Sequence, residues 1–364
     1  MIKELHKKLV NKEISSEELT KQYLDRIAER NPEINGFLIV YEKEALRQAK
    51  KVDKKIEAGE EIGLLEGIPY AVKDNFCVKG EIATAGSKIL EKYRAPYDSF
   101  VMKKLKKTGA ILLGKTNLDE FAMGTSTENS SFGVTKNPVD TIRVAGGSSG
   151  GSAAVVADKQ AVWSLGSDTG GSIRCPASFC GTVGMKPTYG RVSRNGLIAM
   201  ASSYDQIGPF TQTVEDTAII LDEICGQDSK DNTTIFQKTD FLNNLKPEIQ
   251  GKKIGVLKEF MGEDVDLEIK KIIKKKIDWA KKNGAEVFDI EIPGIEASLA
   301  VYYLMICSEV SSNLARFDGI KYGARKKAED ILNTYLKSRE KGLGEEVKRR
   351  IILGTYALSA GYKD

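Results

Sequence analysis

The chain has 364 residues, enough to bury one large hydrophobic core or two smaller ones. Hydrophobic residues make up 41% of it and charged residues 29%, a balance typical of globular proteins and unlike that of disordered chains. Its formal net charge of +4 is too small to indicate nucleic-acid binding by itself.

The five cysteines are scattered and form neither a Cys-x-x-Cys pair nor a Cys/His cluster; they are Cys77, Cys175, Cys180, Cys225 and Cys307. The sequence therefore indicates neither a disulfide framework nor a metal site. The N-terminal residues lack the apolar core of a signal peptide, and no run approaches the ~20 apolar residues of a membrane span. We expect a cytoplasmic protein without a membrane partner.

Two polar helices are predicted near the N-terminus. Ser15–Glu18 resembles a capping box that opens a helix reaching about Arg30, where Asn31–Pro32 should end it. A second helix is expected from about Glu42 to Ala58, before Gly59. Because both helices carry more charge than apolar surface, we interpret this region as an N-terminal helical arm packed on the core.

The arm covers residues 1–60, and residues 61–364 form the predicted main domain. From Gly67 onward, short apolar runs alternate with helical patterns, which indicates an α/β fold with a mixed, largely parallel sheet beneath helices. Residues 252–293 are predicted to form a separate β–α–β unit, and the chain is mostly helical after Ile295.

Two motif matches fail on their context. Gly109–Thr116 fits the phosphate-binding pattern GxxxxGK[ST], but its four central positions are Ala-Ile-Leu-Leu, which predicts a buried strand. Gly147–Gly151 fits the GxSxG pattern of a serine nucleophile, which requires a histidine further along the chain. The only histidine is His6, so this pattern and a Cys–His protease at Cys175 or Cys180 are both excluded.

Without histidine, a lysine held neutral by burial is the plausible base for a serine nucleophile. Lys73 lies in the apolar, strand-like run Ile68–Asp74, whereas most other lysines lie in polar helical runs. From this run alone, Lys73 is either a lysine whose amine reaches water at a strand edge or a functional group.

Two clusters of glycine and serine offer the nucleophile. In Asp168–Ser172, two glycines precede a serine, and their conformational freedom allows successive N–H groups to converge on an anion. Such a nest beside Ser172 would suit an oxyanion hole, although a tight turn capped by Ser172 fits equally well. Gly146–Gly151 allows a close backbone approach or is simply a glycine-rich turn.

Together, Lys73, the run GGSSGGS and the segment DTGGSIR resemble the amidase signature family. The resemblance implies a mixed β-sheet core covered by helices. It also implies a catalytic triad with Ser172 as nucleophile, Ser148 as bridging serine after a cis peptide bond, and Lys73 as base. The implied oxyanion hole consists of the backbone N–H groups around Thr169, Gly170 and Gly171.

Four further segments resemble the glutamine-hydrolysing subunits of tRNA-dependent amidotransferases; they are Phe121–Pro138, Gly190–Ala218, Ser311–Gly323 and Glu345–Tyr362. This resemblance implies that glutamine is hydrolysed and that its ammonia is used by a partner subunit to amidate Glu on tRNA(Gln), or Asp on tRNA(Asn). The implied partners are the B and C subunits of the amidotransferase and aminoacyl-tRNA. No cofactor is expected in this chain, and ATP and Mg are expected at the partner.

By the same resemblance Tyr303 and Arg350 would hold the glutamine, with Tyr302 and Arg349 as adjacent alternatives. Tyr303 could equally be an aromatic residue of a helix core. Family members continue beyond the position of Asp364, so the domain is expected to be incomplete at its C-terminus.

Two other functions stay open at this point. One is a stand-alone amidase of the same family that acts on other amides. The other is a scaffold without catalytic activity that binds partner subunits or tRNA through its basic helices.

Overall fold

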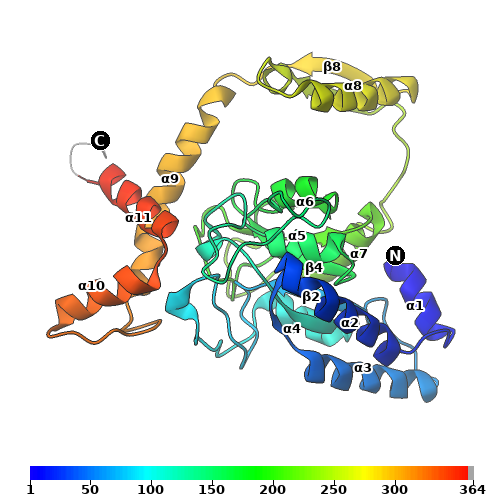
Figure 1. Ribbon diagram of the computed structural model, residues 1–364. Coiled ribbons are helices and arrows are strands. Elements are labelled where there is room, and N and C mark those ends of the chain that lie inside the picture. Colours follow the sequence, from blue (N-terminus) through cyan, green and yellow to red (C-terminus); the bar gives the residue numbers. More distant parts are fainter. Residues whose placement is uncertain (360–364) are drawn as a thin grey trace. The chain divides into compact units, whose positions relative to one another are not determined.

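The computed structural model describes residues 1–359 and divides into two compact units. The larger unit comprises residues 1–243 and the chain from Cys307 onward, and the smaller unit comprises Asn244–Ile306 (Figure 1). The segment Glu345–Tyr362 falls partly outside the described residues, because these end at Ser359.

A six-stranded mixed sheet forms the centre of the larger unit; its strands are β1 (Phe37–Val40), β2 (Pro69–Lys73), β3 (Ile111–Thr116), β4 (Trp163–Asp168), β5 (Val183–Gly184) and β6 (Gln206–Thr211). Their order is β1-β3-β2-β4-β6-β5. Strand β2 runs parallel to both of its neighbours, whereas β1 and β6 are antiparallel to theirs. The predicted mixed α/β fold is confirmed, but the expectation of a largely parallel sheet is wrong, because only the two pairings of β2 are parallel and the other three are antiparallel.

The helices of the larger unit are α1 (Ile2–Val10), α2 (Ser16–Ile34), α3 (Glu42–Glu57), α4 (Phe100–Thr108), α5 (Gly150–Ala157), α6 (Arg174–Cys180), α7 (Val214–Ile224), α10 (Ile331–Gly342) and α11 (Glu345–Ala357). Helix α9 (Ser298–Asn313) begins in the smaller unit and ends in the larger one. Short 3₁₀ turns are η1 (Lys88–Leu90), η2 (Glu120–Ala122), η3 (Lys258–Met261), η4 (Ile295–Ala297) and η5 (Leu314–Arg316). No helix among residues 1–359 is long and apolar enough to cross a membrane.

The N-terminal helices follow their predicted capping, with one correction. Ser15 and Glu18 form the expected capping box. Helix α2 nevertheless continues through Pro32 to Ile34, so the predicted end near Arg30 is wrong. A proline so near the C-terminal end removes one backbone donor only, and the extra turn buries Ile34 completely in the core.

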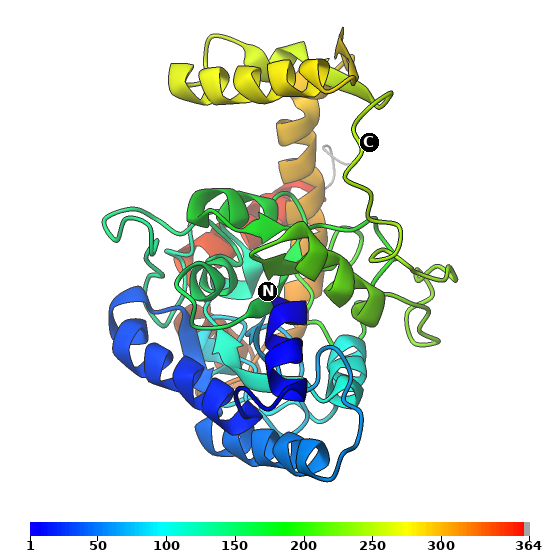
Figure 2. The ribbon, with the colours of Figure 1, turned by 90° about the vertical axis from the view of Figure 1, so that its right-hand side faces the viewer.

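Residues 1–60 contribute to the core of the larger unit. Helices α2 and α3 lie side by side, as Figures 1 and 2 both show. Strand β1 joins the main sheet by pairing with β3, and Ile2 and Leu9 of α1 are completely buried. The boundary placed at residue 60 stays a prediction, since these contacts do not test whether the arm and residues 61–364 fold separately.

The smaller unit contains the predicted β–α–β arrangement. Strand β7 (Lys253–Leu257) pairs in parallel with β8 (Glu286–Ile290), and α8 (Leu267–Lys282) connects them. A parallel pair needs such a crossover connection, which the alternation of apolar and polar runs had indicated.

The interpretation of Gly109–Thr116 as a strand is also confirmed. Helix α4 ends at Thr108, and Gly109 turns the chain with a positive φ of 73°. The following segment forms β3, and all of its residues are buried. Lys115 therefore lies inside the protein and does not belong to a phosphate-binding loop.

Candidate active site

The sheet brings Lys73 to a cluster of serine hydroxyls. Lys73 ends β2 and is completely buried. Its Nζ lies 2.8 Å from the Oγ atoms of both Ser148 and Ser149, and 3.0 Å from Oγ of Ser167. The predicted association of Lys73 with the first glycine–serine cluster is thus present. Ser167 was missed, because nothing in its apolar strand sequence marks it as a partner of a lysine.

Strand register explains why Lys73 points toward this cluster. Lys73 pairs with Thr116 of β3, and residues paired in this way share a face of the sheet. On that face Oγ1 of Thr116 lies 2.6 Å from Oγ of Ser152 in α5. Helix α5 therefore packs over the end of β2, and the residues before it carry Ser148 and Ser149 to the amine.

Burial of Lys73 disfavours its charged form. Desolvation lowers the pKa of Lys73 from 10.5 to about 7, although the carboxylates of Asp119, Asp205 and Asp168 act in the opposite direction. A substantial fraction of the amine is therefore neutral near pH 7, which is the protonation state that a general base requires.

Ser148 and Ser149 differ in their remaining contacts. Oγ of Ser149 donates to the carbonyl of Ser167 at 3.0 Å and accepts from the N–H of Ser167 at 3.3 Å. Within the described part of the chain, Oγ of Ser148 has Lys73 as its only hydrogen-bond partner. The Gly147–Ser148 peptide bond is cis, as expected. Ser149 is thus tied to β4, whereas Ser148 is left to contact a further group.

The second cluster is organised by Asp168 at the end of β4. Its carboxylate accepts hydrogen bonds from the N–H groups of Gly171 at 2.8 Å and Ile173 at 3.0 Å, and from the guanidinium of Arg174 at 3.0 Å. Burial would raise the pKa of Asp168, but these hydrogen bonds lower it below its usual value. The carboxylate thereby fixes the backbone on both sides of Ser172.

The N–H of Gly171 consequently donates to Asp168 and is not left to bind an anion. This contact leaves the predicted place of Thr169 and Gly170 in the oxyanion hole unaffected. The oxyanion-hole assignment as a whole remains a prediction.

Ser172 lies beside the first cluster. Its carbonyl accepts from the N–H of Ser149 at 3.2 Å, and its side chain is buried. Among residues 1–359, no hydrogen bond joins the hydroxyls of Ser148 and Ser172, so the proposed proton route has one contact in place, between Lys73 and Ser148, and one still to form.

The two predicted glutamine-binding residues belong to different units. Tyr303 is half-buried on α9 within the smaller unit, and its ring centroid lies 5.7 Å from that of Tyr302. Arg350 is buried on α11 in the larger unit, where its Nε donates to Glu346 at 2.6 Å. Arg349 is exposed and pairs with the same glutamate. Both assignments remain predictions.

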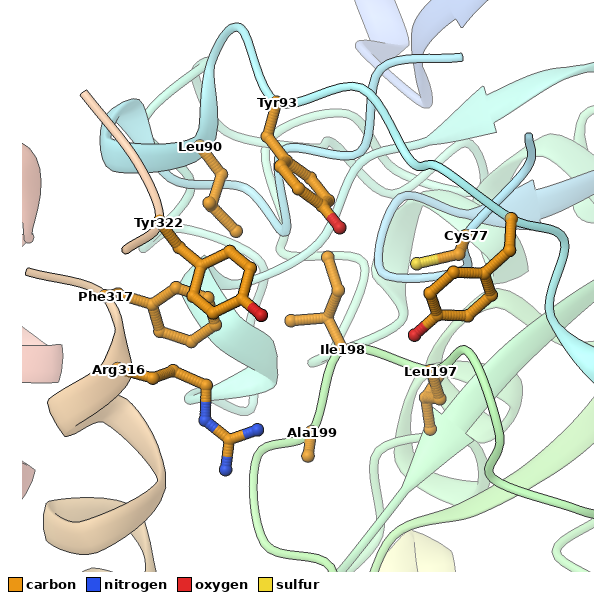
Figure 3. Close-up of a pocket in the computed structure, with 10 residues that line it drawn as sticks. Cys77, Leu90, Tyr93, Leu197, Ile198, Ala199, Arg316, Phe317 and Tyr322 are labelled. Atoms are coloured by element: carbon orange, nitrogen blue, oxygen red, sulfur yellow. The ribbon is translucent and has the colours of Figure 1, made fainter. Parts of the chain in front are cut away.

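A cavity of about 150 Å³ in the larger unit was not predicted (Figure 3). The hydroxyls of Tyr93 and Tyr322 and the guanidinium of Arg316 point into it. One wall contains Ile198, whose N–H donates to the carbonyl of Asn75 at 2.8 Å. The amide of Asn75 donates to Oγ of Ser167 at 3.0 Å, which connects this wall to the hydroxyls around Lys73.

No group of three or more potential metal ligands occurs among the described residues. The chemistry that these residues offer is that of hydroxyl, amine and backbone N–H groups, which suits nucleophilic attack on a carbonyl carbon.

The family model described as Amidase matches residues 18–364, and the chain belongs to this amidase family. The A subunit of the glutamyl-tRNA(Gln) amidotransferase of Gloeothece citriformis is 55% identical over 364 residues, which are 100% of this chain and 75% of the relative. The corresponding protein of Heliobacterium modesticaldum is 54% identical over 99% of this chain and 74% of the relative.

Solved structures agree with this family assignment. The A subunit of the glutamyl-tRNA(Gln) amidotransferase of Thermotoga maritima has a TM-score of 0.76 and 41% identity, covering 95% of this chain and 69% of that one. The peptide amidase of Stenotrophomonas maltophilia has a TM-score of 0.84 and 29% identity, covering 100% of this chain and 76% of that one. The predicted amidase-signature fold is therefore confirmed.

Proposed function

We propose that this chain hydrolyses glutamine as the amidase component of a tRNA-dependent amidotransferase. The observation that carries the proposal is the 2.8 Å contact between the buried amine of Lys73 and the hydroxyl of Ser148. The similarity to the A subunits of glutamyl-tRNA(Gln) amidotransferases supports glutamine as the amide donor.

The proposed reaction uses Ser172 as nucleophile. Neutral Lys73 accepts a proton from Ser148 while Ser148 accepts the proton of Ser172, whose Oγ attacks the side-chain amide carbon of glutamine. Backbone N–H groups around Thr169 and Gly170 stabilise the oxyanion. The tetrahedral intermediate expels ammonia, which takes up the transferred proton, and water then hydrolyses the glutamyl ester to glutamate and free Ser172.

The ammonia has a defined destination in this proposal. One of the partner proteins, the B or C subunit of the complex, uses it to amidate Glu on tRNA(Gln), or Asp on tRNA(Asn), with ATP and Mg bound at that partner. In this proposal, aminoacyl-tRNA is bound by the assembled complex in the cytoplasm.

A stand-alone amidase is the second candidate. It is favoured by the similarity to the Stenotrophomonas maltophilia peptide amidase, whose TM-score of 0.84 extends over the whole chain. The chemistry at Lys73, Ser148 and Ser172 would be the same, and the ammonia would escape into solution. An intact set of these three residues argues against a scaffold without activity.

The test is ammonia release from glutamine and from a panel of other primary amides, measured with and without co-expressed partner subunits. Glutamine should be preferred, and mass spectrometry should detect a glutamyl ester on Ser172. Ser172→Ala should abolish the ester, whereas Ser178→Ala, at an exposed serine on α6, should leave it unchanged. Fast release from assorted amides without any partner would favour the stand-alone amidase instead.

A further inference from the structure

Asp74 follows Lys73 directly, yet its carboxylate faces away from the serine cluster. Oδ1 of Asp74 lies 2.8 Å from Nζ of Lys115, and both side chains are completely buried. The second charge of this pair comes from the Gly-Lys-Thr run that mimics a phosphate-binding loop. Neither residue has a part in the proposed reaction.

The buried pair is held from both sides. The ammonium of Lys115 donates hydrogen bonds to the carbonyls of Phe76 at 2.8 Å and Ile82 at 3.3 Å. Its contact with Oδ1 of Asp74 is an ion pair that lacks hydrogen-bond geometry. The other carboxylate oxygen of Asp74 accepts from the N–H of Thr84 at 3.0 Å and from the hydroxyl of Thr84. These hydrogen bonds offset part of the cost of burying the two charges.

The sheet places this pair and the serine cluster on opposite faces. Val72 pairs with Lys115 and Lys73 pairs with Thr116 in neighbouring parallel strands. Since successive side chains alternate between faces, Lys115 and Asp74 share the face opposite to Lys73 and Thr116. The amine of Lys73 and the carboxylate of Asp74 are therefore close along the chain but separated by the backbone.

Three carboxyl groups already lie within reach of Lys73, although burial raises the pKa of Asp205 to about 7 and the pKa of Asp119 above its usual value. Asp119, Asp168 and Asp205 each favour its charged form. Asp119 accepts from the N–H of Thr127, and Asp205 accepts from two backbone N–H groups. A further uncompensated carboxylate next to Lys73 in the chain would favour the ammonium form still more, because buried charges are weakly screened.

We propose that Lys115 is a positioning residue that neutralises Asp74 on the face of the sheet opposite to Lys73 and thereby keeps the amine of Lys73 available as a base. The inference rests on the role of Lys73 in the proposed function. In this proposal, Lys115 of the Gly-Lys-Thr run supplies the positive charge that balances Asp74, the residue after the base.

A pair of opposite substitutions tests this proposal. Lys115→Met leaves Asp74 uncompensated and should raise the pKa of Lys73 by about one unit, the effect of one nearby poorly screened charge. Asp74→Asn leaves Lys115 uncompensated and should lower that pKa. The double variant Asp74→Asn/Lys115→Met removes both charges and should return the pKa to within about 0.3 units of the wild-type value.

The readout is NMR titration of protein labelled with ¹³C at lysine Cε, with the Lys73 signal assigned by its absence in Lys73→Gln. Because this readout needs no substrate, it decides the inference even if glutamine is not the amide hydrolysed. The pH profile of kcat/KM for glutamine is a second readout and should move in the same directions. Lys106→Met, which removes a lysine from an exposed pair with Asp98, is the control and should cause no shift.

A merely structural pair would lower the free energy of unfolding in both single variants without shifting the Lys73 titration in opposite directions. Shifts of the same sign, or no shift in Asp74→Asn, would overturn the proposal. Should Lys115→Met fail to fold, Asp74→Asn and the double variant still decide it by their difference.

Discussion

Lys73 combines a role in the proposed chemistry with a cost in stability. Its amine reaches the serine hydroxyls only from a completely buried position on β2, and this burial lowers its pKa to about 7. The unfolded chain keeps the ordinary value near 10.5. Between these two values the unfolded state therefore binds a proton that the folded state does not.

The sign of the resulting pH dependence is fixed by linkage. The cost of the buried charge is fully present below pH 7, where both states are protonated, and disappears as the pH rises toward 10.5. The difference between a pKa of 10.5 and one of about 7 corresponds to on the order of 5 kcal/mol. Lys73→Met should therefore gain stability relative to wild type most strongly at about pH 6 and least at about pH 10.

Urea unfolding of both proteins at these pH values measures the effect. Exposed Lys103→Met is the control, and its difference from wild type should not change with pH. A Lys73→Met difference that is equally independent of pH would show that the amine is not perturbed in the folded protein.

The same amine should control the activity. We expect kcat/KM for glutamine to rise with pH through an apparent pKa near 7, which belongs to the coupled unit of Lys73, Ser148 and Ser172. Lys73→Arg should be nearly inactive, because a guanidinium does not release its proton in this range. A normal rate of acyl-enzyme formation in Lys73→Arg, followed by mass spectrometry, would show that another group takes the proton.

Substitutions of the two adjacent serines should separate an effect on catalysis from an effect on stability. Ser148→Ala should remove the proton bridge and reduce kcat by about 10²–10⁴-fold with little change in unfolding temperature. Ser149→Ala should mainly destabilise, by about 1–3 kcal/mol, since the N–H of Ser167 loses its contact with this hydroxyl and the carbonyl of Ser167 loses one of its two contacts, the other being Nζ of Lys73 at 3.4 Å. Steady-state kinetics and thermal unfolding of both variants distinguish these effects. A far greater loss of kcat in Ser149→Ala would reverse the assignment.

At the scale of elements, the sequence predicted what depends on local pattern. The strand nature of β3, the capping box of α2 and the β–α–β unit all follow from the spacing of apolar residues and from turn chemistry. The association of Lys73 with Ser148 followed from a family resemblance. Features that depend on strand register could not be predicted, because neither Ser167 beside Lys73 nor Lys115 beside Asp74 is marked by any local signal.

The position of the start of α5 depends on the absence of a side chain at Gly151. A Cβ atom at Gly151 would lie 2.5 Å from the carbonyl oxygen of Asn117 and 2.6 Å from that of Gly36. Both neighbours are backbone and cannot move aside cheaply. Gly151→Ala should therefore displace α5 and with it Ser148 and Ser149, lowering the free energy of unfolding by more than about 2 kcal/mol and reducing kcat.

Gly63→Ala is the matched control, because a Cβ atom there meets open space and its φ is not positive. Chemical denaturation should show no loss for this variant. Equal stability of Gly151→Ala and Gly63→Ala would mean that α5 can shift without disturbing the sheet.

At the scale of the whole molecule, the residues proposed for catalysis and for glutamine binding are distributed unevenly between the two units. Lys73, Ser148 and Ser172 all belong to the larger unit, while Tyr303 lies in the smaller one. The chain spans 75% of the length of the Gloeothece citriformis relative and 74% of the Heliobacterium modesticaldum relative. The three residues proposed for the amidase chemistry thus all belong to the larger unit.

Assembly should regulate this chemistry. Free ammonia is lost to solvent unless a partner consumes it, so we expect glutaminase turnover to rise when partner subunits and aminoacyl-tRNA bind. No hydrogen bond joins the hydroxyls of Ser148 and Ser172 among residues 1–359, so we expect partner binding to bring them together and complete the path to Lys73. Ammonia release by the chain alone, by the assembled complex and by the complex with tRNA should increase in that order. The Ser148→Ala variant should show no such increase, because it lacks the hydroxyl on which the coupling acts. Equal turnover alone and in the complex would contradict the proposed regulation and favour the stand-alone amidase.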